Sequence, residues 1–205
     1  MEYRIDDLIL ELHSIHKQLN DFLFSSTLSD IKIAIETSKR RNSLTLGHFD
    51  PSQDWSDNKN QITIWTLTLN GDYIRLIGVL VHEMVHQFNH ERGIKDVENN
   101  QRHNKKFKEA AIAAKLNVSE VSSKAKGFNN TSVSQELRHY IENKLDFNKD
   151  LFKKMIHKDA LSHEPKGYNK SNKYICGCGT VINNSRIDPL KIKCLECNKV
   201  FEKIN

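Results

Sequence analysis

The sequence lacks the features that would place it in a membrane or send it out of the cell. No apolar run approaches the roughly 20 residues that a membrane-spanning helix needs. Residues 1–7 are rich in charge, and no apolar segment of the kind found in a signal peptide follows them. No cysteine precedes Cys176, so a disulfide framework is not expected over most of the chain. These absences predict a soluble protein of the cytoplasm without a membrane partner.

The composition is that of a folded protein with a modest basic excess. Hydrophobic residues make up 38% of the chain, which is enough for a core. The 205 residues suffice for one domain of about 150 residues and a small appended one. The formal net charge is +5 and the pI is about 8.9. This excess alone only weakly favours a polyanionic partner such as nucleic acid.

Two histidines four residues apart are the most informative feature of the chain. The segment His82-Glu83-Met84-Val85-His86 follows the apolar run 77–81, which favours a buried helix. On an α-helix, His82 and His86 lie nearly above one another and can reach one metal ion. Glu83 is turned about 100° away from them, which leaves it free to act as a general base on water at that metal. H-E-x-x-H also occurs by chance on surface helices, but the apolar context favours a metal site.

A catalytic zinc ion needs a third protein ligand, and His90, Glu98 and His103 are the candidates. His90 extends the same helical row, and three ligands along one straight helix cannot surround a tetrahedral ion. Gly93 predicts the end of the helix, and the polar stretch 95–102 returns the chain toward it. We therefore expect His103, which opens the next predicted helix, to be the third ligand.

The four cysteines all lie within the last thirty residues of the chain. They are Cys176, Cys178, Cys194 and Cys197. Two close pairs of this kind can fold as two knuckles around one tetrahedral Zn²⁺, with short strands near 180–182 and 191–193. The alternative is a pair of disulfides, which the predicted intracellular location disfavours. The pattern indicates a structural zinc site, whose metal supplies folding free energy that so small a module lacks.

Together these motifs resemble the SprT-like zinc metallopeptidases, the family of the DNA–protein crosslink protease Spartan. The family has an H-E-M-[IV]-H helix, a later histidine in a His-Gly-x-x-Phe-like segment and often a C-terminal zinc ribbon. Residues 82–86 match the first motif and residues 103–107 are similar to the second. The stretch 19–24 and a strand at 62–65 also resemble the family, so the resemblance covers nearly the whole chain.

The sequence departs from the family pattern in two places. Asn104 stands where the family usually has glycine, and we expect asparagine to tolerate the left-handed conformation that glycine would supply. Sixteen residues separate His86 from His103, slightly more than the family leads us to expect. We expect this longer loop to alter the rim of the site more than its metal.

The resemblance implies a fold, a domain division and a site. The fold is α+β, a zincin-like metallopeptidase domain with a small antiparallel sheet beside the H-E-x-x-H helix, followed by a zinc ribbon. The divisions are residues 1–157 for the metallopeptidase domain, 158–172 for a linker and 173–205 for the ribbon. One catalytic zinc and one structural zinc are expected. The catalytic base is Glu83, and the catalytic zinc ligands are His82, His86 and His103.

The expected substrate is a protein bound or crosslinked to DNA, again by resemblance. DNA, single-stranded or crosslinked, is then a partner, and the protein is nucleoid-associated. Basic clusters at 105–108, 124–126, 153–154 and from 166 into the ribbon agree with such a partner but also suit a solvated surface. Two other classes stay open. One is a regulatory metallopeptidase that cleaves a particular protein such as a repressor. The other is a non-enzymatic module whose zinc site is closed by a fourth protein ligand.

Periodicity gives the remaining elements. Apolar residues at helical spacing predict a helix over 4–24, with His13 and His16 off the apolar row and at the surface. Strands are predicted at 31–35 and 43–48, joined by a turn at 39–42, and a third strand at 61–67. A further helix is predicted over 132–145.

Overall fold

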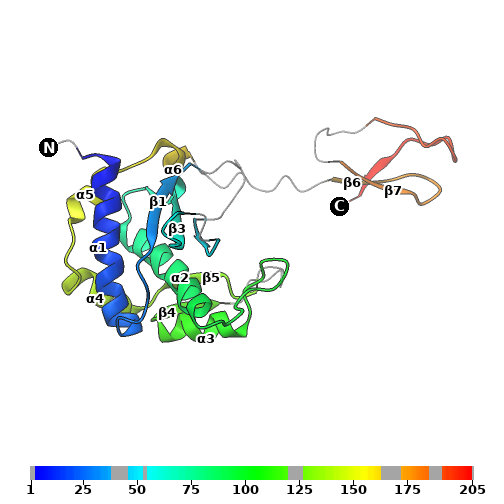
Figure 1. The fold of residues 1–205 in the computed structure, drawn as a ribbon. Helices are drawn as coiled ribbons and strands as arrows, with labels where there is room; N and C mark the ends of the chain where they lie inside the picture. The colour runs from blue at the N-terminus through cyan, green and yellow to red at the C-terminus, as the bar shows by residue number, and fades with distance from the viewer. Residues whose placement is uncertain are drawn as a thin grey trace. The chain divides into compact units, whose positions relative to one another are not determined.

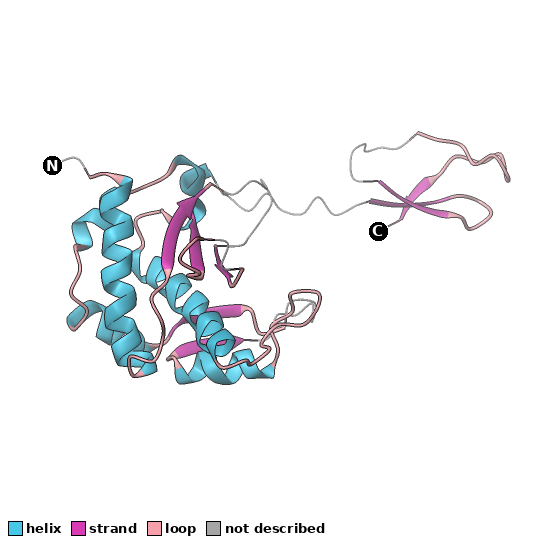
Figure 2. Cartoon of the chain, in the orientation of Figure 1, coloured by secondary structure: helices cyan, strands magenta, loops and turns pink. Residues whose placement is uncertain are grey.

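The computed structural model describes residues 3–37, 46–52, 55–119, 127–162, 172–184 and 191–204. The chain forms two compact units, Met1–Ser162 and His163–Asn205 (Figure 1). The first unit combines helices with two small sheets, and the second is built on a small sheet alone (Figure 2). The expectation of a mixed α+β chain is therefore confirmed.

Helix α1, Ile5–Phe24, forms as its apolar pattern predicts. Its start is fixed by Arg4, whose backbone N–H donates to the Asp7 carboxylate at 2.7 Å. Its end is marked by Ser25, which adopts the left-handed conformation. One face of the helix is completely buried in the core through Leu8, Leu12, Ile15 and Leu19.

The prediction that His16 lies at the surface is wrong. Its side chain is only 6% exposed, and its Nε2 lies 2.9 Å from Oε1 of Gln87 on helix α2, Tyr73–Glu91. The amide nitrogen of Gln87 donates to Ser29 O and to Glu91, so its oxygen must accept from the Nε2–H of His16. Because α2 covers α1 beside the apolar row, the buried face of α1 is wider than that row.

A His16→Gln substitution is expected to flatten the pH dependence of the stability of the first unit. Burial is the main cause that lowers the pKa of His16, and His13, Glu91 and Asp30 are the charged groups around it. The unfolded chain therefore takes up this proton at higher pH than the folded chain. As a result, the free energy of unfolding decreases as the pH falls below about 6.5.

Chemical denaturation of the chelator-treated protein at several pH values measures this effect, because proton competition for bound metal then does not contribute. Tryptophan fluorescence reports on the first unit, which contains both tryptophans, Trp55 and Trp65. The matched control is His139→Gln, at an exposed histidine of helix α4, Gln135–Asn143. Equal slopes below pH 6.5 in the wild type and in the His16 variant would contradict the assignment.

The first sheet is mixed rather than antiparallel. Its order is β1-β3-β2, with β1 at Lys32–Glu36, β2 at Gly47–Asp50 and β3 at Gln61–Trp65. Strand β1 pairs parallel with β3, and β2 pairs antiparallel with it. The expectation of an antiparallel sheet is therefore wrong for the pair β1 and β3, and the predicted turn at 39–42 lies outside the described residues. The order follows from burial, because Ile62, Thr63 and Ile64 are all buried and give β3 the central place.

Helix α2 packs against β2 and β3 and carries the H-E-x-x-H segment. It follows a short 3₁₀ helix, η1, Thr66–Thr68, and its N-cap Asp72 accepts a hydrogen bond from Arg75 N at 3.0 Å. Its buried face includes Ile77 and Leu80, both fully buried. Gly93, at φ +66°, follows the end of the helix, as predicted.

The rest of the first unit surrounds α2. Helix α3, Lys105–Ala113, leads into the antiparallel pair β4, Leu116–Ser119, and β5, Asn130–Val133, and this pair packs against α2. The predicted helix over 132–145 begins only at Gln135, because the residues before it pair with β4. The last helices of this unit are α5, Lys149–Lys154, and α6, Lys158–Ser162, so α6 occupies the first part of the predicted linker. Residues 163–171 of that linker lie outside the described residues.

The second unit is a small antiparallel sheet of order β7-β6-β8. Its strands are β6, Asn172–Ile175, β7, Val181–Asn184, and β8, Glu202–Ile204. The buried residues are Tyr174 and Phe201 together with Cys176 and Cys194. In neither unit does a described helix combine the length and the apolar character that crossing a bilayer would require.

Candidate metal centre

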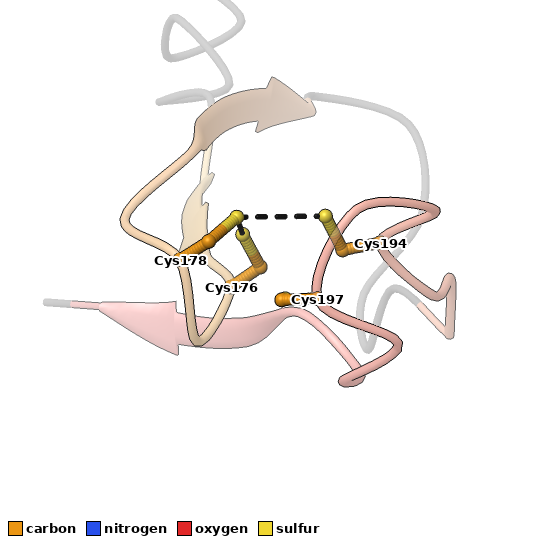
Figure 3. A group of neighbouring side chains, drawn as sticks. All are labelled: Cys176, Cys178, Cys194 and Cys197. Atoms are coloured by element: carbon orange, nitrogen blue, oxygen red, sulfur yellow. Dashed lines mark hydrogen bonds between the residues drawn. The ribbon is translucent and has the colours of Figure 1, made fainter.

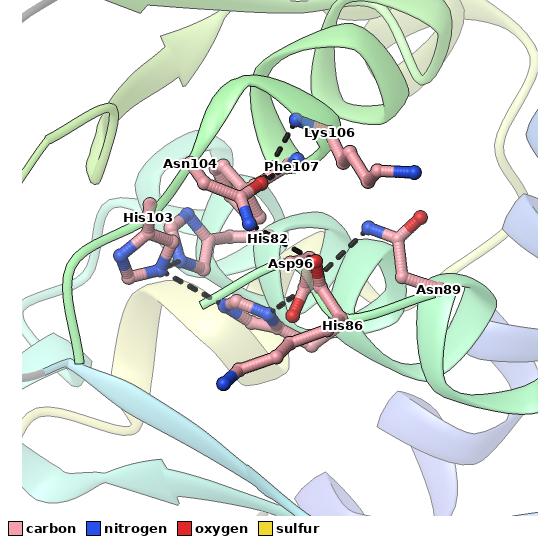
Figure 4. A network of polar contacts seen from close by, with 9 residues as sticks. His82, His86, Asn89, Asp96, His103, Asn104, Lys106 and Phe107 are labelled. Carbon is pink, nitrogen blue, oxygen red and sulfur yellow. Dashed lines mark hydrogen bonds and ion pairs between the residues drawn. The ribbon is translucent and has the colours of Figure 1, made fainter. Parts of the chain in front are cut away.

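Three imidazoles of the first unit converge on one point (Figure 4). The Nε2 atom of His103 lies 3.3 Å from Nε2 of His82 and 3.0 Å from Nε2 of His86. Nitrogens held about 2.0–2.1 Å from one tetrahedral Zn²⁺ lie about 3.3 Å apart. The three residues expected as ligands from the sequence therefore stand at the spacing that such an ion requires.

Different local structures place the three histidines. His82 and His86 are one turn apart on α2. His103 precedes α3 rather than opening it. It pairs with Val97 across a tight hairpin and forms a second, parallel bridge with Gly127. The turn of this hairpin is closed by Glu98 N donating to Arg102 O at 2.9 Å. The expectation that His103 belongs to the helix is corrected accordingly.

Asn104 does not adopt the left-handed conformation that glycine could supply at this position. Its backbone is extended, at φ −95° and ψ −173°, and it is the N-cap of α3. Its side-chain oxygen accepts from Lys106 N at 2.8 Å and from Phe107 N at 3.2 Å. Asparagine is favoured here as a cap, which also fixes the backbone immediately after His103.

The outer ring nitrogens of two histidines have polar partners that the sequence did not indicate. His82 Nδ1 lies 2.9 Å from Thr131 Oγ1 on β5. His86 Nδ1 lies 2.8 Å from Asp96 Oδ2, in the loop between α2 and His103. These contacts engage the Nδ1 atoms and leave the Nε2 atoms facing one another. We expected this loop to alter the rim of the site more than its metal, but Asp96 in the loop contacts an expected metal ligand directly.

An apolar wall lies behind the three imidazoles. The ring centroid of Phe107 is 4.8 Å from His82, 4.8 Å from His86 and 4.4 Å from His103. Phe107 is completely buried. It therefore excludes water from one side of the group and holds the rings in place.

Glu83 lies beside this group, 5% exposed and pressed against strand β2. The backbone N–H of Phe49 donates to its carboxylate. A Cβ added at Gly47 would lie 2.8 Å from Oε1 of Glu83 and 2.8 Å from Val79 Cγ1, so glycine is required for this close approach. Burial raises the pKa of Glu83 to about 7. A carboxyl group with this pKa can both accept and release a proton near neutral pH.

The pKa values of two of the histidines are shifted in opposite directions. Burial lowers the pKa of His82 well below its usual value, and the neighbouring imidazoles lower it further. Burial also opposes protonation of His86, but the hydrogen bond to Asp96 and the charge of Glu83 outweigh it and raise the pKa of His86. The neutral form favoured at His82 is the form in which a histidine binds metal.

The two other candidates for the third ligand lie apart from the group. His90 is exposed, and its ring centroid is 5.6 Å from that of Phe49. Glu98 is exposed on the hairpin. Within the part of the chain that the structure describes, the metal-competent group of this unit consists of the three histidines alone.

The four cysteines form a second group, in the second unit (Figure 3). Cys178 Sγ lies 3.0 Å from Cys176 Sγ and 3.7 Å from Cys194 Sγ, and all four sulfurs lie within 4.8 Å of one another. None is in a disulfide. Sulfurs about 2.3 Å from one tetrahedral Zn²⁺ lie about 3.8 Å apart. Partial burial raises the pKa of Cys176, but the hydrogen bond with Cys178 outweighs it and lowers the pKa to about 6, which favours a thiolate.

The comparisons with known proteins identify a family for the part of the chain that holds the histidines. Residues 12–139 match the model of the SprT-like family, a range that contains the three histidines and Glu83 and ends before the cysteines. No curated protein and no solved structure gives a significant match. Because the matched range covers more than half of the 205 residues, the chain belongs to the SprT-like family.

Proposed function

We propose that this protein is a zinc-dependent endopeptidase in which His82, His86 and His103 hold the zinc ion and Glu83 is the catalytic base. The observation that carries the proposal is the convergence of three Nε2 atoms beside the buried carboxylate of Glu83, which lies on the same helix as two of the three histidines. When bound there, zinc supplies a Lewis acid that polarises a carbonyl and lowers the pKa of water. Family membership supports the same chemistry.

The protein side chains have separate tasks in this proposal. Glu83 accepts a proton from the attacking water and delivers it to the leaving amine. The contact of its carboxylate with Phe49 N–H holds it against β2 and limits its motion. Thr131 and Asp96 orient two of the histidines, and Phe107 keeps water from the apolar side.

A closed, purely structural zinc site is the less favoured alternative. It requires a fourth protein ligand, for which His90 and Glu98 are the candidates that the sequence offers. Both are exposed, and neither joins the group among the described residues. Three protein ligands are the number typical of a catalytic zinc site, which supports the enzymatic proposal.

We further propose that the four cysteines hold a structural zinc, which makes the second unit a zinc ribbon. The spacing of their sulfur atoms and the absence of a disulfide among the four support this assignment. The metal would complete a core that otherwise consists of a few side chains.

Proteins associated with DNA or crosslinked to it are the proposed substrates. The exposed Lys105 and Lys106 lie at the start of α3, directly after His103 and Asn104. The second unit adds exposed lysines on its small sheet and its loops, namely Lys173, Lys191, Lys193, Lys199 and Lys203. Such groups release counterions on binding phosphates. Cleavage that single-stranded DNA does not stimulate, together with no salt-dependent DNA binding, would favour the regulatory peptidase that cleaves one particular protein.

A Glu83→Gln substitution is expected to abolish cleavage while leaving the fold and the zinc content unchanged. Glutamine keeps the shape of the side chain but cannot take up the proton, and loss of a general base typically costs about 10²–10⁴-fold in rate. The measurement is cleavage of a protein substrate with and without single-stranded DNA, alongside zinc analysis of the same samples.

The matched control is Glu109→Gln, at an exposed glutamate of α3. It is expected to cleave at the wild-type rate. Cleavage by the Glu83 variant at that same rate would remove Glu83 from the mechanism. Full zinc content in the wild type with no cleavage under any condition would favour the non-enzymatic module.

A further inference from the structure

We infer that Asp96 is a positioning residue that fixes the ring of His86 and thereby sets the zinc affinity of the histidine site. The inference rests on the proposed function only in taking His86 as a zinc ligand. It concerns the loop that runs from α2 to His103. This loop leads into one expected zinc ligand, His103, and carries Asp96, which contacts another, His86.

The geometry gives Asp96 a single defined place. Its Oδ2 accepts from His86 Nδ1 at 2.8 Å and from Asn89 Nδ2 at 3.0 Å (Figure 4). Its backbone oxygen accepts from Asn104 N at 3.0 Å, and Asn104 Nδ2 donates to Lys95 O at 3.0 Å. The main chain at Asp96 is therefore tied to the residue that follows His103, and the carboxylate cannot turn away from His86 without also losing its bond to Asn89.

The chemistry of the contact determines which nitrogen of His86 carries the proton. An ionised carboxylate only accepts hydrogen bonds, so Nδ1 must be the donor and Nε2 keeps its lone pair. That lone pair faces His103 Nε2, at 3.0 Å. A carboxylate on the outer nitrogen also makes the imidazole a stronger metal ligand. The hydroxyl of Thr131 serves His82 in the same position but without a charge.

The burial of Asp96 argues against a role confined to the surface. The residue is 8% exposed, and burying a carboxylate is costly unless it is paired. A loop that needed only an anchor could use a neutral side chain at lower cost. Glu98, in the same hairpin, shows the contrast because its side chain is exposed.

Zinc affinity of the histidine site is the direct test. Competition with a chelating indicator, on the full chain, is expected to show about 10–100-fold weaker binding for Asp96→Ala than for the wild type. Asp96→Asn keeps an acceptor oxygen but loses the charge, so an intermediate loss is expected. Glu98→Gln removes a carboxylate from the same loop without contacting the site and should bind zinc like the wild type. Thermal unfolding of each metal-free variant shows whether it is folded.

Wild-type affinity in the folded Asp96→Ala variant would overturn the inference. If that variant does not fold, Asp96→Asn decides, and wild-type affinity there would overturn it equally. Neither outcome depends on cleavage, so a failure here is distinguishable from the failure of the peptidase proposal, which the Glu83 variant tests.

The tautomer of His86 provides a second test, because a purely structural role of Asp96 would leave this tautomer unchanged. Nitrogen-resolved NMR of the metal-free wild type, at a pH where the imidazoles are neutral, is expected to show His86 protonated at Nδ1. In Asp96→Ala this preference should be lost, whereas Glu98→Gln should keep it. A wild-type His86 protonated at Nε2 would overturn the inference without any variant.

Discussion

A His103→Ala variant is expected to lose the zinc ion of the histidine site and, with it, all measurable cleavage. Two imidazoles on one helix leave the ion with too few protein ligands for a stable site. Groups that only orient a ligand already contribute about 10–100-fold to metal affinity, so loss of the ligand itself should cost more than about 100-fold. Zinc analysis after passage through chelator-containing buffer should find one ion per chain fewer than in the wild type.

The fold of this variant should survive, because the main chain at residue 103 carries most of the local structure. Its carbonyl accepts from Phe128 N at 3.1 Å, and its backbone bridges Val97 and Gly127. Alanine preserves these bonds. The lost ring contact with Phe107, at 4.4 Å between centroids, should lower the stability slightly.

The matched control is His90→Ala, which removes an exposed histidine of α2 that lies outside the group. It should keep its zinc and its activity. A His103→Ala variant with full zinc content would contradict the assignment, because another group would then complete the site.

The parts of the site that could be predicted from the sequence are those set by local geometry. His82, Glu83 and His86 follow from the period of one helix, and that helix ends near Gly93 as its sequence indicates. His103 could be chosen because ligands on a single straight helix cannot surround an ion. In each case one short segment, or one steric argument, decided the outcome.

The contacts that the sequence did not reveal are made between separate segments of the chain. Their positions depend on loops, which carry no periodic pattern in the sequence. Asp96 lies in a stretch that shows only polarity in the sequence, and its meeting with His86 depends on the hairpin that bridges Val97 and His103. Thr131 reaches His82 from a strand that is 49 residues away in the chain. Gly47 faces Glu83 because β2 crosses α2 closely. A carboxylate placed shortly before the third histidine is the one signal that could have indicated Asp96.

The order of the strands in the first sheet likewise could not be predicted from local sequence patterns. The predicted turn at 39–42 favoured a hairpin between the first two strands, but burial of β3 on both faces places it between them. In β1 only Ile33 is buried, so this strand can lie at the edge of the sheet. The prediction for His16 was wrong for a related reason. The spacing of apolar residues along α1 cannot reveal its buried polar contact with Gln87.

A Cys194→Ser substitution is expected to unfold the second unit while the first unit keeps its fold and its zinc. Among the described residues of the second unit, the buried side chains are Tyr174, Cys176, Cys194 and Phe201, too few to offset the entropy of ordering the chain. A structural zinc ion supplies about 10–16 kcal/mol to domains of this kind. Serine is a poor ligand for it, so the largest stabilising contribution disappears.

Limited proteolysis and NMR distinguish this outcome from a general loss of stability. In the variant, cleavage should begin within residues 172–204, and the NMR signals of Tyr174 and Phe201 should collapse to unfolded positions while those of the first unit remain. Leu195→Ser is the matched control, because Leu195 is 100% exposed between two cysteines and does not belong to the core. Chelation of the wild type should reproduce the variant. A well-folded second unit in Cys194→Ser would show instead that its few packed side chains suffice without metal.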